Sequence, residues 1–128
     1  MANNNKSLGT GLETRVVKRA RDRGLEASRQ PGSGVYSDFP NDVVVEANVP
    51  GLGVLRLLGE CKVRSRHPNY SEMQEWLEAA QENAKKSKQF QAAFLTYNVK
   101  GSRIPRVMLD LDDFLDILAL LDAARVAS

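Results

Sequence analysis

The sequence predicts an α/β protein with a mixed central β-sheet flanked by helices, and two observations lead to that fold class. Segments of helical and strand periodicity alternate along the chain, in the order helix, strands, helix, strands, helix. The chain has 128 residues, of which 42% are hydrophobic and 27% charged, as expected for one globular domain with its own core. We therefore expect a single domain over residues 1–128, with residues 1–8 disordered.

The first element is expected to be a helix over residues 11–24. Its apolar side chains recur at helical spacing, and Gly24 is a natural C-terminal stop. Residues 25–29 follow as a candidate short strand. Residues 30–39 are rich in Gly, Pro and Ser in their first half, so a loop is expected there.

A hairpin is expected next. A β-branched run predicts a strand over residues 42–47, and a second strand is expected over residues 54–63. The Pro50-Gly51-Leu52-Gly53 segment between them has the composition of a turn. The two strands would therefore pair side by side.

The second half of the chain predicts a helix, two strands and a last helix. A Ser-Glu-Met-Gln capping box opens the helix expected over residues 71–88. Strands are expected over residues 90–97 and 104–109, the latter at a sheet edge because Pro105 cannot donate a ladder hydrogen bond. The last helix is expected over residues 110–124.

This last helix is apolar around most of its circumference, with polar residues only at positions 112, 113, 116 and 122. An apolar surface that wide exceeds one core-facing stripe, so we expect a second partner, most simply a second copy of the chain. The predicted homodimer interface holds one of two sets: Phe114, Leu118 and Leu121, or the neighbouring Ile117 and Leu120.

The formal net charge of +2 does not identify a nucleic-acid binder, but its distribution is uneven. Residues 1–30 carry an excess of Lys and Arg, and residues 110–128 an excess of Asp. This pattern predicts one face for a polyanion, or alternatively two solvated helix surfaces. The single cysteine, Cys61, excludes an internal disulfide, and the sequence has neither an apolar run of the ~20 residues that span a bilayer nor an apolar N-terminal signal. We expect a cytoplasmic protein.

Glu13 is a candidate site residue because it shares the inward face of the first helix. It lies three and four residues before Val16 and Val17. A carboxylate on an apolar face is unfavourable unless something pairs with it. The alternative is an acid that simply lies near the positive end of the helix dipole.

The predicted hairpin supplies a second group of candidates. Side chains alternate along a strand, so Glu60 and Lys62 are expected on one side of the sheet and Cys61 on the other. Asp42 can meet Glu60 across the pair, and a divalent cation such as Mg²⁺ or Mn²⁺ would relieve the repulsion of the two carboxylates. Lys62 could then fix or deprotonate a metal-bound water beside a phosphate. The alternative is a surface ladder pair of Glu60 with Lys62 or Arg56.

Four segments follow one another in the first half of the chain: Gly11-x-Glu13, Arg29-x-Pro31-Gly32-Ser33-Gly34, Pro40-Asn41-Asp42-Val43-Val44 and Gly59-Glu60-Cys61-Lys62. Together they resemble the PD-(D/E)xK nuclease superfamily, and most closely the archaeal-type Holliday junction resolvases. The second half agrees only in its pattern of elements. The resemblance implies a restriction-endonuclease-like core and an Mg²⁺-dependent endonuclease of DNA recombination and repair, with Mn²⁺ as a substitute.

The resemblance also implies a role for each matched residue. The implied metal ligands are Glu13, Asp42, Glu60 and the backbone carbonyl of Cys61. Lys62 would position the nucleophilic water, and Ser33 would contact the scissile strand as part of the catalytic site. The family usually has Pro directly before the Asp, whereas Asn41 intervenes here, so Asp38 is an alternative to Asp42.

Basic and polar side chains near these segments are expected to contact DNA. They are Lys6, Arg15, Arg29, Ser33, Arg64, Arg66 and His67. Cys61 is expected to pack in the core rather than act as a nucleophile. Trp76 is expected in a core or dimer contact rather than stacked on a base.

The sequence thus predicts a homodimeric endonuclease that acts on branched double-stranded DNA and resolves four-way junctions by paired phosphodiester hydrolysis. Two alternatives remain open. One is another PD-(D/E)xK nuclease, restriction-like or of the flap/repair type, without junction selectivity. The other is a non-catalytic DNA-binding dimer of the same fold.

Overall fold

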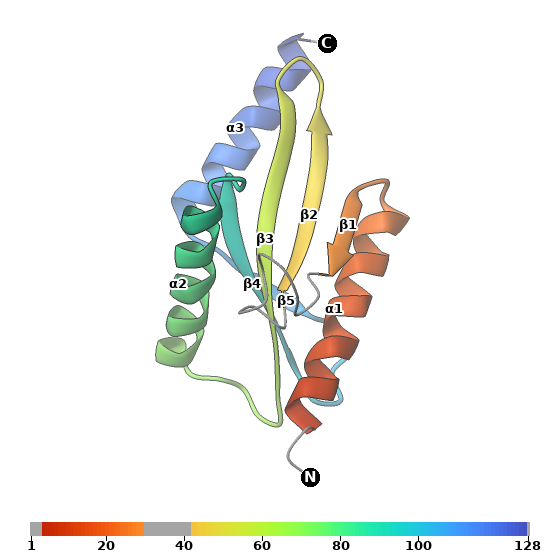
Figure 1. Ribbon diagram of the computed structural model, residues 1–128, viewed down its shortest axis with the longest axis vertical. Coiled ribbons are helices and arrows are strands. Elements are labelled where there is room, and N and C mark those ends of the chain that lie inside the picture. The colour runs from red at the N-terminus through yellow and green to blue at the C-terminus, as the bar shows by residue number, and fades with distance from the viewer. Residues whose placement is uncertain (1–3, 30–41, 128) are drawn as a thin grey trace.

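Figure 1 shows the computed structural model, which describes residues 4–29 and 42–127, with side chains over 11–29 and 43–125. Its elements are α1 (Asn4–Asp22), β1 (Glu26–Arg29), β2 (Asp42–Val49), β3 (Gly53–Arg64), α2 (Tyr70–Ser87), β4 (Ala92–Val99), β5 (Arg106–Met108) and α3 (Leu111–Ala127). The predicted class, a mixed α/β sheet flanked by helices, is confirmed.

The sheet is mixed because β3 and β4 run parallel, whereas the other neighbours are antiparallel. Its order is β1-β2-β3-β4-β5, and α2 makes the crossover from β3 to β4. β2 and β3 form the expected hairpin, and β5 lies at an edge directly after Pro105, as predicted. Residues 61–64 of β3 extend beyond the described end of β2.

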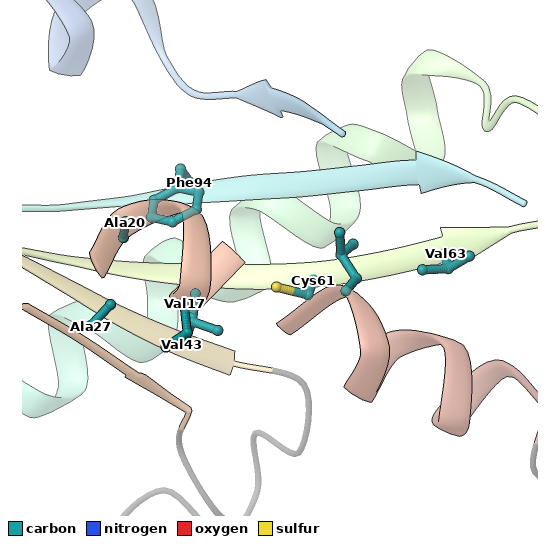
Figure 2. Packing of buried hydrophobic residues seen from close by; sticks show 8 residues of the cluster. Val17, Ala20, Ala27, Val43, Cys61, Val63 and Phe94 are labelled. Atoms are coloured by element: carbon teal, nitrogen blue, oxygen red, sulfur yellow. The ribbon is translucent and has the colours of Figure 1, made fainter. Parts of the chain in front are cut away.

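Alternation along the strands separates two cores, one on each face of the sheet. On one face α1 packs on the strands through the buried cluster of Leu12, Val17, Ala20, Ala27, Val43, Cys61, Val63 and Phe94, most of which Figure 2 labels. On the other face α2 packs through the cluster of Ala80, Ala84, Val44, Leu58 and Ala93. Odd-numbered residues of β2 and β3 therefore face α1, and even-numbered residues face α2.

α3 lies alongside the β2–β3 hairpin (Figure 1). The strand residues that pack against it are odd-numbered, which places it on the α1 side of the sheet. Ile117 and Leu120 pack against the core cluster of the hairpin end. Large apolar side chains on the rest of the helix are exposed: Leu111, Phe114, Leu115, Leu118 and Leu121. The two predicted interface sets therefore differ in position, because one faces the core and the other is exposed.

The observed boundaries correct the predicted ones in several places. α1 begins at Asn4, seven residues before the expected start at residue 11. The strands after α2 begin two residues later than expected, at Ala92 and Arg106. No helix in the described ranges combines the length and hydrophobicity needed to cross a membrane.

The capping box of α2 forms two residues earlier than predicted. The Asn69 side chain accepts a hydrogen bond from the backbone N–H of Glu72, and the Glu72 side chain accepts one from the backbone N–H of Asn69. Asn caps a helix as well as Ser does, and an ionised Glu at the third position also favours the positive end of the helix dipole. The earlier box therefore replaces the one predicted at Ser71.

Candidate active site

The hairpin register places Asp42 opposite Glu60, as the sequence predicted. Lys62 follows on the same side of β3, and its Nζ lies 3.3 Å from Oε1 of Glu60. Only 14% of the Glu60 side chain and 21% of the Lys62 side chain are exposed, so solvent screens this pair weakly. Arg56 pairs with Glu46 instead, at 2.8 Å.

Glu13 is held on the α1 side of the sheet and is completely buried. Neither of its carboxylate oxygens has a hydrogen-bond partner among the described residues. Its ion pair with Arg29 is long, with 3.8 Å between Nη2 of Arg29 and Oε2 of Glu13. Burial raises the pKa of Glu13 from 4.5 to about 7; Arg29 opposes this rise, and the negative charge of Glu60 adds to it.

The negative charge of Glu60 contributes to the raised pKa of Glu13, although the two residues belong to opposite faces of the sheet. This is feasible because α1 contacts β3 directly and the described part of β2 ends opposite Glu60. A buried carboxylate with unsatisfied oxygens is strongly unfavourable. A hard cation bound at Glu13 would supply the partner that its oxygens lack among the described residues.

The described side chains alone contain no group of three His, Cys, Asp or Glu residues placed to hold a metal ion. Asp42, the third carboxylate predicted from the sequence, is described only by its backbone, which lies opposite Glu60. Of the predicted carboxylate ligands, the structure therefore describes the side chains of Glu13 and Glu60. Both are oxygen donors of the kind that Mg²⁺ and Mn²⁺ accept.

Trp76 is a site neighbour that the sequence interpretation missed. Its ring centroid lies 4.7 Å from Cζ of Arg64 and 5.7 Å from Nζ of Lys62. The prediction of a core or dimer contact overlooked this neighbourhood, and among the described residues Trp76 belongs to none of the three buried clusters. The short connection from β3 to α2 is the one sequence signal, since it keeps the first turns of the helix near the end of the strand.

The other predicted site residues lie outside the group of Glu13, Glu60 and Lys62. Arg66 and His67 are exposed just beyond β3, Arg15 is half-buried on α1, and Arg29 pairs with Glu13. Four predicted residues have side chains outside the described part of the chain: Lys6, Ser33, Asp38 and Asp42.

Cys61 is buried in the cluster beneath α1, as predicted, so its thiol faces away from the Glu60–Lys62 side of the strand. Figure 2 shows its sulfur among apolar side chains of that cluster. This surrounding supports packing over nucleophilic chemistry.

The chain matches no protein-family model, and no curated protein matches it. Membership of the PD-(D/E)xK superfamily therefore stays a prediction from the four sequence segments.

Proposed function

We propose that this protein is a cytoplasmic, metal-dependent DNA endonuclease that resolves four-way junctions. The observation that carries the proposal is Glu13, a fully buried carboxylate that receives no hydrogen bond from the described residues. The negative charge of Glu60, which pairs with Lys62, contributes to its raised pKa. A stable fold rarely retains such a group without a function for it. The order of the matching sequence segments supplies the reaction class.

In this proposal Glu13, Asp42 and Glu60 would hold Mg²⁺, with the backbone carbonyl of Cys61 as a further ligand. When bound, Mg²⁺ would make a water more acidic and stabilise the leaving 3′ oxygen. The Lys62 ammonium would hold the attacking water by donating a hydrogen bond to its oxygen, and the proton that the water loses would pass to solvent. Glu60 keeps the Lys62 ammonium at a fixed position through the ion pair at 3.3 Å.

The DNA path is proposed to run along basic side chains on either side of this centre. A surface groove of about 500 Å³ between α1 and β1 is lined by Lys18, Arg21 and Arg29, and by Asp22, which pairs with Lys18. Beyond the end of β3, Arg66 and His67 add exposed donors. Phosphate contacts of this kind give affinity without sequence preference, as recognition of a DNA shape requires.

A homodimer is proposed to form through the exposed side of α3, which carries Phe114, Leu118 and Leu121. Each of these side chains is between 46% and 52% exposed. Contiguous apolar surface on a small protein marks an interaction site. A two-fold dimer would present two identical centres to the two opposed strands of a junction.

The test is a cleavage assay on a four-way junction, a flap and a linear duplex, each with EDTA, Mg²⁺ or Mn²⁺. We expect paired cuts in the junction that EDTA abolishes and either cation restores. Equal cutting of all three substrates would instead indicate a PD-(D/E)xK nuclease without junction selectivity. Binding with no cutting under any condition would indicate a non-catalytic DNA-binding dimer, and full activity in EDTA would overturn the metal assignment.

A further inference from the structure

Two cations of the candidate site share one aromatic ring. The Trp76 centroid lies 4.7 Å from the Arg64 guanidinium carbon and 5.7 Å from the Lys62 ammonium nitrogen. Both distances are within the range over which a cation is attracted to the face of an indole ring. Lys62 also contacts Glu60 at 3.3 Å, so its ammonium lies between a carboxylate and a ring.

The local structure explains why these groups meet. Lys62 and Arg64 are two residues apart on β3, so both project from the face that α2 covers. The capping box at Asn69 and Glu72 fixes the residue at which α2 begins. It thereby helps to set where Trp76 lies along β3. Arg64 is further restrained because its Nη1 donates a hydrogen bond to the carbonyl of Val63 at 2.8 Å.

We infer that Trp76 is a positioning residue, which holds the Lys62 ammonium against Glu60 and aligns the Arg64 guanidinium with the passing phosphate. A lysine head group on a flexible four-carbon stem would otherwise occupy many rotamers. Attraction to a fixed ring and to a carboxylate restricts it to a small volume, and catalysis is sensitive to such placement. The inference rests on the proposed nuclease function for its catalytic consequence, but not for the placement itself.

Placement is tested first, without DNA or metal, by NMR of the lysine side chains. In the wild type the Lys62 ε-methylene protons should be shifted upfield by the indole ring current. Trp76→Phe should keep part of that shift, and Trp76→Leu should abolish it. Tyr70→Leu is the matched control, because Tyr70 is an exposed aromatic of the same helix with no cation over its ring among the described contacts.

Catalysis is tested next with the same variants on the preferred DNA substrate. Trp76→Leu should lower kcat about tenfold and change KM by less than about threefold, because the ring positions Lys62, whereas DNA affinity is shared among many basic side chains besides Arg64. Trp76→Phe should recover most of kcat, to within about threefold of wild type, since a phenyl ring retains a weaker attraction for cations. Tyr70→Leu should match the wild type.

The outcomes separate this inference from the proposed function. If Lys62 keeps its shift in Trp76→Leu, the positioning role is wrong whatever the enzyme activity. If the shift is lost while kcat stays unchanged, or if Phe and Leu reduce kcat equally, the ring has no catalytic role and the inference fails. If the wild type cuts no DNA while the shift behaves as expected, the nuclease proposal fails but the placement of Lys62 by Trp76 stands.

Discussion

At the scale of single residues, Glu13 is the side chain whose burial is least favourable for the stability of the fold. Its carboxyl group is withdrawn from water and receives no hydrogen bond from the described residues, and its ion pair with Arg29 is long. The resulting pKa of about 7 means that, without a cation, this residue is largely protonated in mildly acidic solution. A bound divalent cation would favour the ionised form.

This shift predicts a stability that depends on pH. Between about pH 4.5 and pH 7 folded Glu13 holds a proton that the unfolded chain has released, so the free energy of unfolding falls as pH rises. The total fall from this group is on the order of 3 kcal/mol. Glu13→Gln lacks it, so the variant should gain stability relative to the wild type as pH rises. Urea unfolding from pH 4.5 to 8 without metal measures this, and parallel curves for the two proteins would contradict it.

Lys62 is the residue whose loss should separate catalysis from binding. Lys62→Ala should reduce cleavage by about 10²-fold or more, as expected for a group that positions the nucleophile. DNA affinity should stay within about tenfold, because many basic side chains share the phosphate contacts. Glu60→Gln should behave in the same way.

The matched control is Lys86→Ala, an exposed lysine in the last turn of α2. Its cleavage rate and its affinity for DNA should both equal those of the wild type. Binding measured by fluorescence anisotropy and cleavage measured on the same substrate compare the variants. Equal loss of binding and cleavage in Lys62→Ala would show that the Glu60–Lys62 pair is structural.

At the scale of elements, the β3–β4 contact depends on Gly59. A Cβ at this position would overlap the ring of Phe94, which is packed in the core beneath α1. Gly59→Ala should therefore lower the free energy of unfolding by about 1–3 kcal/mol, because the ring has to leave its place. Gly11→Ala is the control: its Cβ would meet nothing, and alanine should favour the helix by roughly 0.5–1 kcal/mol. Equal effects in urea unfolding would argue against close packing at Gly59.

A charge introduced by mutation should have different effects on the two sides of α3. Leu118→Asp changes an exposed side chain and should leave a folded protein, whereas Ile117→Asp places a charge against the hairpin core and should unfold it or make it insoluble. If the exposed side is the dimer interface, Leu118→Asp should sediment as a monomer at micromolar concentration while the wild type sediments as a dimer. A wild type that is itself monomeric there would rule this interface out.

At the scale of the whole molecule, the proposed dimer couples two cuts. Each subunit carries its own Glu13, Glu60 and Lys62, so a monomer should still nick DNA. Leu118→Asp should therefore convert a cruciform plasmid mainly to nicked circles, whereas the wild type should give linear product from paired cuts. Linear product formed by the monomeric variant at the wild-type rate would contradict the arrangement.

The sequence by itself determined the features that depend on local periodicity. Strand alternation put Glu60 and Lys62 on one face and Cys61 on the other, and the turn after residue 49 set the register that brings Asp42 opposite Glu60. The wide apolar surface of the last helix was also visible in the sequence. Each of these follows from neighbours within a few residues or within one hairpin.

Only the tertiary structure decided the features that join distant segments. Packing of α1 on the sheet left Glu13 buried without a hydrogen-bond partner among the described residues, and packing of α2 brought Trp76 to Lys62 and Arg64. Docking of α3 on the hairpin packed Ile117 against the core cluster and left the opposite side of the helix exposed. A helical stripe defines which residues share a face, but the face that is buried depends on the angle and height at which the helix meets the sheet. Which face of a helix is buried depends on how much apolar surface the whole molecule removes from water. It therefore cannot be read from any single segment of the sequence.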